Sequence, residues 1–212
     1  DLETIFADFE RIVPDAMTHW QHPRFFAYFP ANAAPASMVA EQLTAVMAAQ
    51  CMLWQTSPAA TEMERRMVDW MRQALGLPEV FTGVIQDSAS TATLSAVLTM
   101  RERALDWRGV EAGLAAGPRL RIYASGQNHS SVDKAVRLAG IGQENLVKVA
   151  TDATWALDAE ALADAITADR SAGHRPAGLV LCVGGTSIVA SDRLREAIEV
   201  ALTITEAQPR PA

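Results

Sequence analysis

The chain has 212 residues, half of them hydrophobic, and a formal net charge of -7 at pH 7, which predicts one large domain, or one domain with an arm, around a buried core. It has no basic stripe with interleaved aromatic residues, no run of 18 apolar residues and no opening signal peptide. We therefore expect no nucleic-acid partner and no membrane span. The two cysteines form no CxxC pattern and the four histidines lack zinc spacing, so a cytoplasmic protein without a metal site is expected.

The first 78 residues are expected to form a helical segment used for dimerisation. Apolar positions repeat at close to the helical period over residues 1–20. A loop with three prolines and four aromatic residues follows at 22–35 (HPRFFAYFPANAAP). Residues 36–50 predict a helix that is too apolar to remain in water, which indicates a homodimer interface. A further helix is expected within 57–78.

From residue 79 onward, strands alternate with helices. Strands are expected at 119–125 (RLRIYAS), 146–150 and 177–187. The last of these is an apolar run typical of a parallel strand that is buried on both faces. Helices are expected at 89–105, 130–141, 157–173 and 191–202, the last two capped by Asp158 and Ser191. The alternation predicts an α/β fold with a mostly parallel sheet flanked by helices.

Three segments rich in Gly, Ser, Thr or His are expected to meet at one edge of this sheet. They are 86–91, 125–131 and 183–188, and parallel α/β sheets bind ligands at the carboxyl ends of their strands. The first begins a helix with Ser88, Ala89 and Ser90. The unpaired amides at a helix start attract anions, so a phosphate site is one interpretation. A plain serine cap is the other, and the neighbouring negative charge of Asp87 favours it slightly.

The other two segments also allow two interpretations each. His129, at a junction between strand and helix, could stack on a flat ring or move a proton. It could equally be an ordinary histidine bonded to a backbone group. The GGTS segment (184–187) offers backbone room and a threonine hydroxyl, or is a simple turn at the end of a strand. Three such segments in chain order make a ligand site a stronger prediction than any one alone.

Five ordered segments resemble one known family. They are HPRFFAYFP (22–30), SPAATEMERRMVDWM (57–71), GVIQDSASTATL (83–94), NHSSVDKA (128–135) and GGTS (184–187). Through them, residues 1–201 are similar to the pyridoxal-phosphate-dependent aromatic L-amino-acid decarboxylases, which are group II decarboxylases. The resemblance implies a fold type I protein in which 79–212 is the first part of the large α/β domain. It also implies a homodimer.

The resemblance implies a function for each cofactor-binding motif. The turn made by Ser88, Ala89 and Ser90 would bind the phosphate of pyridoxal 5'-phosphate. His129 would stack on the pyridine ring and assist protonation after carbon dioxide leaves. Thr186 would contact the cofactor.

The resemblance also implies that the aromatic loop lines the pocket for the substrate side chain. The residues concerned are Trp20, Tyr28, Phe29 and Pro30. Independently of the family, an aromatic wall with few charges suits a flat apolar substrate. A core or dimer plug is the alternative interpretation of this loop.

Two motifs of the family are absent from these 212 residues. The family continues with a His-Val-Asp-Ala type strand, whose aspartate pairs with the pyridine nitrogen, and with a His-Lys pair, whose lysine forms the Schiff base. Here the sequence continues as LTITEAQPRPA (202–212), and neither Lys134 nor Lys148 lies in a matching context. Three alternatives remain open: a truncated or internally deleted product, part of a longer chain, or a site completed by a second polypeptide. The end QPRPA is typical of a flexible terminus and favours the first.

Three functions are therefore considered. The first is decarboxylation of aromatic L-amino acids, of the tryptophan, tyrosine or dihydroxyphenylalanine type, to amines and carbon dioxide. The second is a truncated, non-catalytic remnant or interaction module of this fold. The third is aldehyde-forming oxidative deamination, against which His129 argues. A chain that ends at Ala212 and has no partner polypeptide is expected to bind the cofactor only weakly and to release no carbon dioxide.

Overall fold

The computed structural model describes residues 1–28, 33–115 and 117–206. The predicted pocket residues Phe29 and Pro30 and the predicted flexible end at 207–212 lie outside the described residues. The chain divides into two units, residues 1–62 and 63–212. Among the described residues, none of the helices combines the length and apolar character needed to cross a bilayer.

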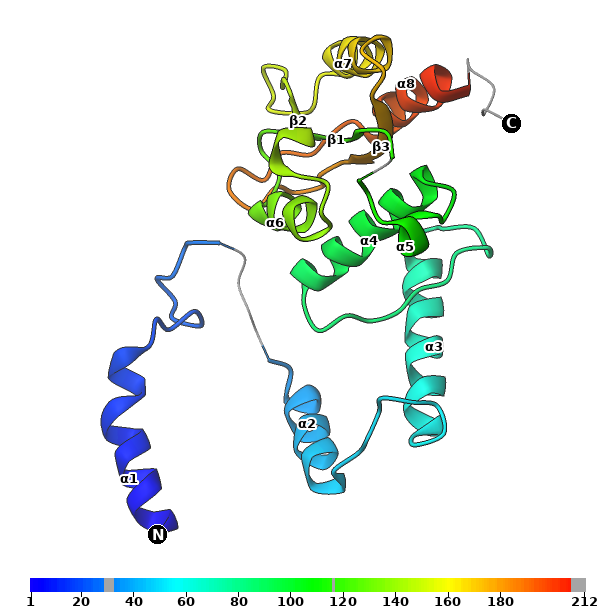
Figure 1. The fold of residues 1–212 in the computed structure, drawn as a ribbon. Helices are drawn as coiled ribbons and strands as arrows, with labels where there is room; N and C mark the ends of the chain where they lie inside the picture. Colours follow the sequence, from blue (N-terminus) through cyan, green and yellow to red (C-terminus); the bar gives the residue numbers. More distant parts are fainter. Residues whose placement is uncertain (29–32, 116, 207–212) are drawn as a thin grey trace. The chain divides into compact units, whose positions relative to one another are not determined.

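The first unit contains helices without a core. Helix α1 (Leu2–Ile12) is capped by Asp1, and a short 3-10 turn (Pro14–Ala16) follows it, so the helix predicted over 1–20 is interrupted at Pro14. Helix α2 (Pro35–Met47) begins with a proline in its first turn and ends before Ala48, which adopts a left-handed conformation. Neither helix contains a buried residue. Both helices are labelled in Figure 1.

Helix α3 (Pro58–Ala74) begins in the first unit and continues into the second. It ends where the sequence predicts, since Gly76 has a φ of 66° and donates its amide to Gln73. The segment that follows is tied back to the helix, because the Ile85 amide donates to the Glu64 carboxylate over 2.8 Å. This contact fixes the approach of the chain to the next helix.

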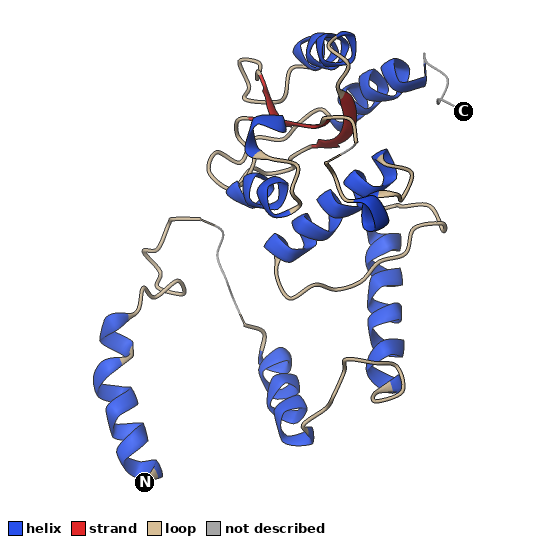
Figure 2. Ribbon diagram, viewed as in Figure 1, coloured by secondary structure: helices blue, strands red, loops and turns tan. Residues whose placement is uncertain are grey.

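The second unit is built on a parallel sheet in the order β2-β1-β3. Its strands, which are drawn in red in Figure 2, are β1 (Leu120–Ser125), β2 (Leu146–Val149) and β3 (Arg175–Val180). Ile122 of β1 pairs with Leu146 on one side and with Gly178 on the other. Because β2 and β3 both run parallel to β1, all three strands end at the same edge.

Helices cover both faces of this sheet. They are α4 (Ala89–Ala104), α5 (Gly109–Ala112), α6 (Ser130–Leu138), α7 (Ala159–Ser171) and α8 (Leu194–Glu206). Leu120, Ile122 and Ala124 share one buried cluster with residues of α4 and α6. Tyr123, between them in β1, belongs to a second cluster with residues of α7 and α8. The alternation along β1 therefore separates two cores, as expected for a strand.

Two local predictions were wrong. Strand β3 occupies 175–180 instead of 177–187, and all six of its residues are partly exposed rather than buried on both faces. Ser191 does not cap the last helix: α8 begins at Leu194, and the Ser191 hydroxyl accepts a bond from the Gly184 amide instead. The cap predicted at Asp158 is confirmed.

Candidate functional site

Helices α4 and α6 run parallel with their first turns side by side. The hydroxyls of Thr93 and Ser131 lie 3.5 Å apart near the start of both helices. Near their other ends, the Arg101 guanidinium donates to the Ala139 carbonyl over 2.7 Å. Since α6 follows the carboxyl end of β1, both helix starts lie at that edge of the sheet (Figure 1). The partial positive charges of two helix dipoles therefore meet there.

Ser88 is the N-cap of α4. Its hydroxyl accepts from the Thr91 amide over 3.3 Å, and the Thr91 hydroxyl accepts from the Ser88 amide over 3.2 Å, which forms a capping box. This cap leaves the amides of Ala89 and Ser90 without an acceptor among the described residues, and both residues are exposed. The two interpretations of this turn are thus compatible, because a cap at Ser88 still leaves two donors for an anion.

Asp87 is turned toward the same capping box, with its carboxylate in contact with the Thr91 hydroxyl. A hydrogen bond from this hydroxyl partly compensates the negative charge. The side chain of Asp87 remains exposed, which weakens its field through solvent screening.

His129 is the N-cap of α6, and its orientation is fixed by the backbone. The Ser131 amide donates to Nδ1 over 3.2 Å. A nitrogen that accepts this bond carries no proton, so the neutral ring holds its proton on Nε2. The residue is exposed at the edge where the two helix starts meet. Nε2 is consequently the ring atom that is available to a ligand.

The GGTS segment forms a tight loop after β3. The Gly185 amide donates to the Ala190 carbonyl over 2.8 Å, and the Val189 amide donates to the Gly185 carbonyl over 2.7 Å. Gly184 has a φ of 69°, a conformation that favours glycine. A Cβ on the buried Gly185 would lie 3.8 Å from the Gln127 carbonyl, so this loop adjoins the turn that leads to His129. Thr186 is half-buried beside it.

A polar cluster that the sequence did not suggest supports the His129 turn. The Lys148 ammonium donates to the Asn128 amide oxygen over 3.2 Å and to the Asp133 carboxylate over 2.9 Å. Burial tends to raise the pKa of Asp133, but the hydrogen bonds from Lys148 and Gln143 outweigh it and lower the pKa. Asp133 and Asn128 lie 15 and 20 residues before Lys148 in the chain, so residue spacing gave no signal for this cluster.

The described aromatic residues of the predicted substrate pocket stack on each other. The ring centroids of Trp20 and Tyr28 lie 5.6 Å apart at 13°, and those of Trp20 and Phe25 lie 5.2 Å apart at 28°. All three residues belong to the first unit. Tyr28 adopts a φ of 58°, which is uncommon for a residue other than glycine. The loop therefore gathers flat apolar surface within its own unit.

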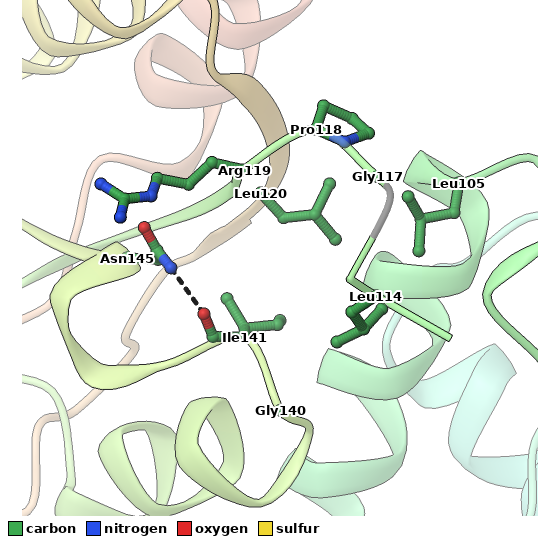
Figure 3. A pocket seen from close by; sticks show the side chains of 9 residues that line it. All are labelled: Leu105, Leu114, Gly117, Pro118, Arg119, Leu120, Gly140, Ile141 and Asn145. Carbon is green, nitrogen blue, oxygen red and sulfur yellow. Dashed lines mark hydrogen bonds between the residues drawn. The ribbon is translucent and has the colours of Figure 1, made fainter. Parts of the chain in front are cut away.

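A cavity of about 200 Å³ lies at the opposite end of β1, away from these loops (Figure 3). Leu105, Leu114 and Ile141 form apolar walls around it, and the Asn145 side chain donates to the Ile141 carbonyl at one side. None of the residues predicted for the ligand site lines this cavity. The candidate ligand site is therefore the carboxyl edge of the sheet, where the helix starts and His129 meet.

A family model described as "Pyridoxal-dependent decarboxylase conserved domain" matches residues 1–204. Tryptophan decarboxylase 2 of Oryza sativa subsp. japonica is 38% identical over 208 residues, which cover 94% of this chain and 41% of that protein. Phenylacetaldehyde synthase of Arabidopsis thaliana is 40% identical over 201 residues, which cover 91% of this chain and 40% of that protein. The chain thus spans about two fifths of the length of these relatives.

Solved structures agree with this result. The crystal structure of Oryza sativa TDC with PLP and tryptamine has a TM-score of 0.88 at 35% identity, and the match covers 96% of this chain and 43% of that one. The crystal structure of Rhodiola rosea 4-hydroxyphenylacetaldehyde synthase has a TM-score of 0.88 at 32% identity, and the match covers 97% of this chain and 45% of that one. These matches confirm the expected fold type I architecture.

Proposed function

Because the chain belongs to the pyridoxal-dependent decarboxylase family, we propose that the protein decarboxylates aromatic L-amino acids with pyridoxal 5'-phosphate as cofactor. The products would be an amine and carbon dioxide. Relatives named tryptophan, tyrosine and aromatic-L-amino-acid decarboxylases support this choice of substrate. The observation that carries the proposal is the meeting of the α4 start, with two unpaired amides, and His129 at one sheet edge.

The residues at this edge fit the chemistry of the cofactor. The amides of Ala89 and Ser90 would donate to its phosphate, together with the hydroxyls of Ser88 and Ser90. The exposed ring of His129 would stack on the pyridine and could hold a proton at Nε2, and Thr186 would contact the cofactor from the neighbouring loop. When bound, the cofactor supplies an electron-withdrawing ring that accepts the electrons left by departing carbon dioxide.

The covalent half of such a site needs a lysine amine. Lys148 is a poor candidate, since its ammonium is paired with the Asp133 carboxylate and bonded to Asn128. Lys134 lies in the middle of α6, in an exposed position and more than one helical turn from His129, the N-cap of that helix. In the proposed reaction, the anchoring lysine and the aspartate for the ring nitrogen would have to be supplied by residues other than 1–212.

We further propose that Trp20 and Tyr28 belong to the wall of the substrate pocket, with Phe29 and Pro30 beside them in sequence. The stacked rings of Trp20 and Tyr28 support this proposal, because a flat apolar side chain can extend such a stack. An aldehyde-forming reaction is the second candidate, and the two relatives named as aldehyde synthases favour it. His129 favours the amine, since it offers a ring proton donor beside the cofactor.

The proposal includes a cytoplasmic homodimer. Residues 1–78 would form the dimerisation segment and 79–212 the first part of the cofactor-binding domain. Exposed apolar residues on α1 and α2 support an interface on this segment, because so much apolar surface is not expected to remain in water. Cys51 and Cys182 are free thiols, which agrees with a reducing compartment.

The full-length protein with bound cofactor tests this function. Supplied with tryptophan, tyrosine or dihydroxyphenylalanine, it should release carbon dioxide and the amine in equal amounts. Replacement of His129 by Ala should lower turnover by roughly 10²–10⁴-fold, the usual scale for a general acid, and change cofactor affinity far less. A colourless protein that binds no cofactor would instead support the non-catalytic module, and ammonia with an aldehyde would support the second candidate.

A further inference from the structure

Asp192 is a buried carboxylate that joins three segments of the second unit. It is 8% exposed and lies just before α8. One carboxylate oxygen accepts from the Leu157 amide over 2.7 Å, and the other accepts from the Cys182 amide over 2.7 Å. Its own amide donates to the Cys182 carbonyl over 2.8 Å. Asp192 thus binds residues 10 and 35 positions away instead of capping the helix that follows it.

The pair formed by Asp192 and Cys182 closes the base of the GGTS loop. Above it, the Gly184 amide donates to the Ser191 hydroxyl over 2.9 Å, and the Gly185 amide donates to the Ala190 carbonyl. The loop contains Val189 at a φ of 58°, a conformation that is costly for a β-branched residue. A loop that holds this conformation needs strong restraints, and hydrogen bonds to a buried charge are among the strongest available.

We infer that Asp192 is a positioning residue that holds the 182–191 loop in the shape that presents Thr186 to the cofactor. The inference rests on the proposed function for its link to the cofactor, while the restraint on the loop stands on the hydrogen bonds alone. Among the hydrogen bonds of the described residues, those of Asp192 join it to Leu157 and Cys182 and none joins it to Thr186 or to the starts of α4 and α6, so its effect on the cofactor would pass through the loop.

The test compares two aspartates of the same chemistry. Asp192→Asn keeps the shape of the side chain but must turn an amide donor toward one of the two backbone amides. Asp158→Asn is the matched control, because Asp158 also accepts from two amides, those of Glu160 and Ala161, at the start of α7. Ser191→Ala is a milder second variant, which removes only the bond from Gly184.

Two measurements on the full-length protein separate the effect on the loop from the effect on cofactor binding. Hydrogen exchange without cofactor should be about tenfold faster at the amides of Gly185 and Val189 in Asp192→Asn, and pyridoxal 5'-phosphate affinity should fall about tenfold. Asp158→Asn should leave both within about twofold. If Asp192→Asn does not fold, Ser191→Ala should change both quantities in the same direction by a smaller factor.

Unchanged exchange in the loop, or equal effects of Asp192→Asn and Asp158→Asn, would overturn the positioning inference. Faster exchange with unchanged cofactor affinity would overturn the link to Thr186. A parent protein that binds no cofactor would contradict the proposed function, and the exchange data would still test the restraint on the loop. Each failure is therefore distinguishable.

Discussion

The two units of the chain use apolar residues in opposite ways. In residues 1–62, every described apolar side chain is at least partly exposed, including a stripe along α1. In residues 63–212, apolar side chains form two buried clusters, one on each face of the sheet. Helical periodicity is present in both units, so periodicity alone does not create a core. A helix needs a second surface, which the sheet supplies in residues 63–212. In residues 1–62 the proposed homodimer would supply it.

Replacing one leucine in each unit by alanine should reveal the largest difference between the units, which is a difference in the free energy of unfolding. Leu162→Ala in α7 removes a side chain with 0% exposure and should lower the free energy of unfolding by about 2–5 kcal/mol. Leu43→Ala in α2 removes one with 58% exposure and should change it by less than about 0.5 kcal/mol. Denaturant unfolding at low protein concentration measures both. Equal losses would mean that α2 is packed within its own chain.

The proposed association through the first unit should be sensitive to one added charge. Val46→Asp places a carboxylate on α2 where the valine is 84% exposed, and it should weaken the proposed homodimer roughly a hundredfold because the charge would lose its water at the interface. Leu138→Asp is the control, since that leucine of α6 is 74% exposed in the second unit. Sedimentation across a concentration series gives both dissociation constants. A dimer weakened only by Leu138→Asp would move the interface to the second unit.

A smaller effect is expected from an ion pair that joins β1 to α7. Burial raises the pKa of Asp169, but hydrogen bonds from Arg121 and Tyr123 outweigh it, so the pKa is lowered. A lowered pKa stabilises the fold above the unfolded value of about 3.9, and this contribution is lost as the pH falls through the folded pKa. Asp169→Asn should therefore cost about 1–3 kcal/mol near neutral pH and progressively less in acid.

Unfolding free energies measured from neutral pH to about pH 3 test whether the cost of Asp169→Asn falls in acid. Asp8→Asn is the control in the first unit, where Asp8 pairs with Arg11 on an exposed helix face and should contribute less than about 1 kcal/mol. A cost for Asp169→Asn that grows in acid would contradict the direction of the pKa change.

The sequence predicted the elements of the second unit well where local signals agree. Asp158 caps the start of α7, and Gly173, just after the end of that helix, adopts a left-handed conformation. Both features are local signals that the sequence contains. The start of α4 was also located, because small hydroxyl residues before a helix act through neighbours three positions away. Helix caps are predictable because the contacts that stabilise them lie within one helical turn.

Predictions failed where contacts between residues far apart in the sequence determine the local structure. Arg175 and Pro176 do not read as strand residues, but they pair with Leu120 and Arg121, and the register shifts beside the proline. Ser191 was predicted to cap a helix, but its hydroxyl accepts a hydrogen bond from the Gly184 amide instead. Asp192 gave no signal, since its partners lie on two other segments. The candidate site was predictable as motifs, whereas the bonds that hold those motifs together were not.

In the proposed site, the start of α4 would receive the cofactor phosphate. Titration of the full-length parent protein, Ser90→Asp and Ser95→Asp with pyridoxal 5'-phosphate tests this most directly. Both serines are exposed on α4, but only Ser90 lies in its first turn. A carboxylate about 4 Å from a phosphate costs several kcal/mol, so Ser90→Asp should weaken binding by at least about a hundredfold. Ser95→Asp should stay within about twofold of the parent. Unchanged affinity in Ser90→Asp would show that the phosphate binds elsewhere.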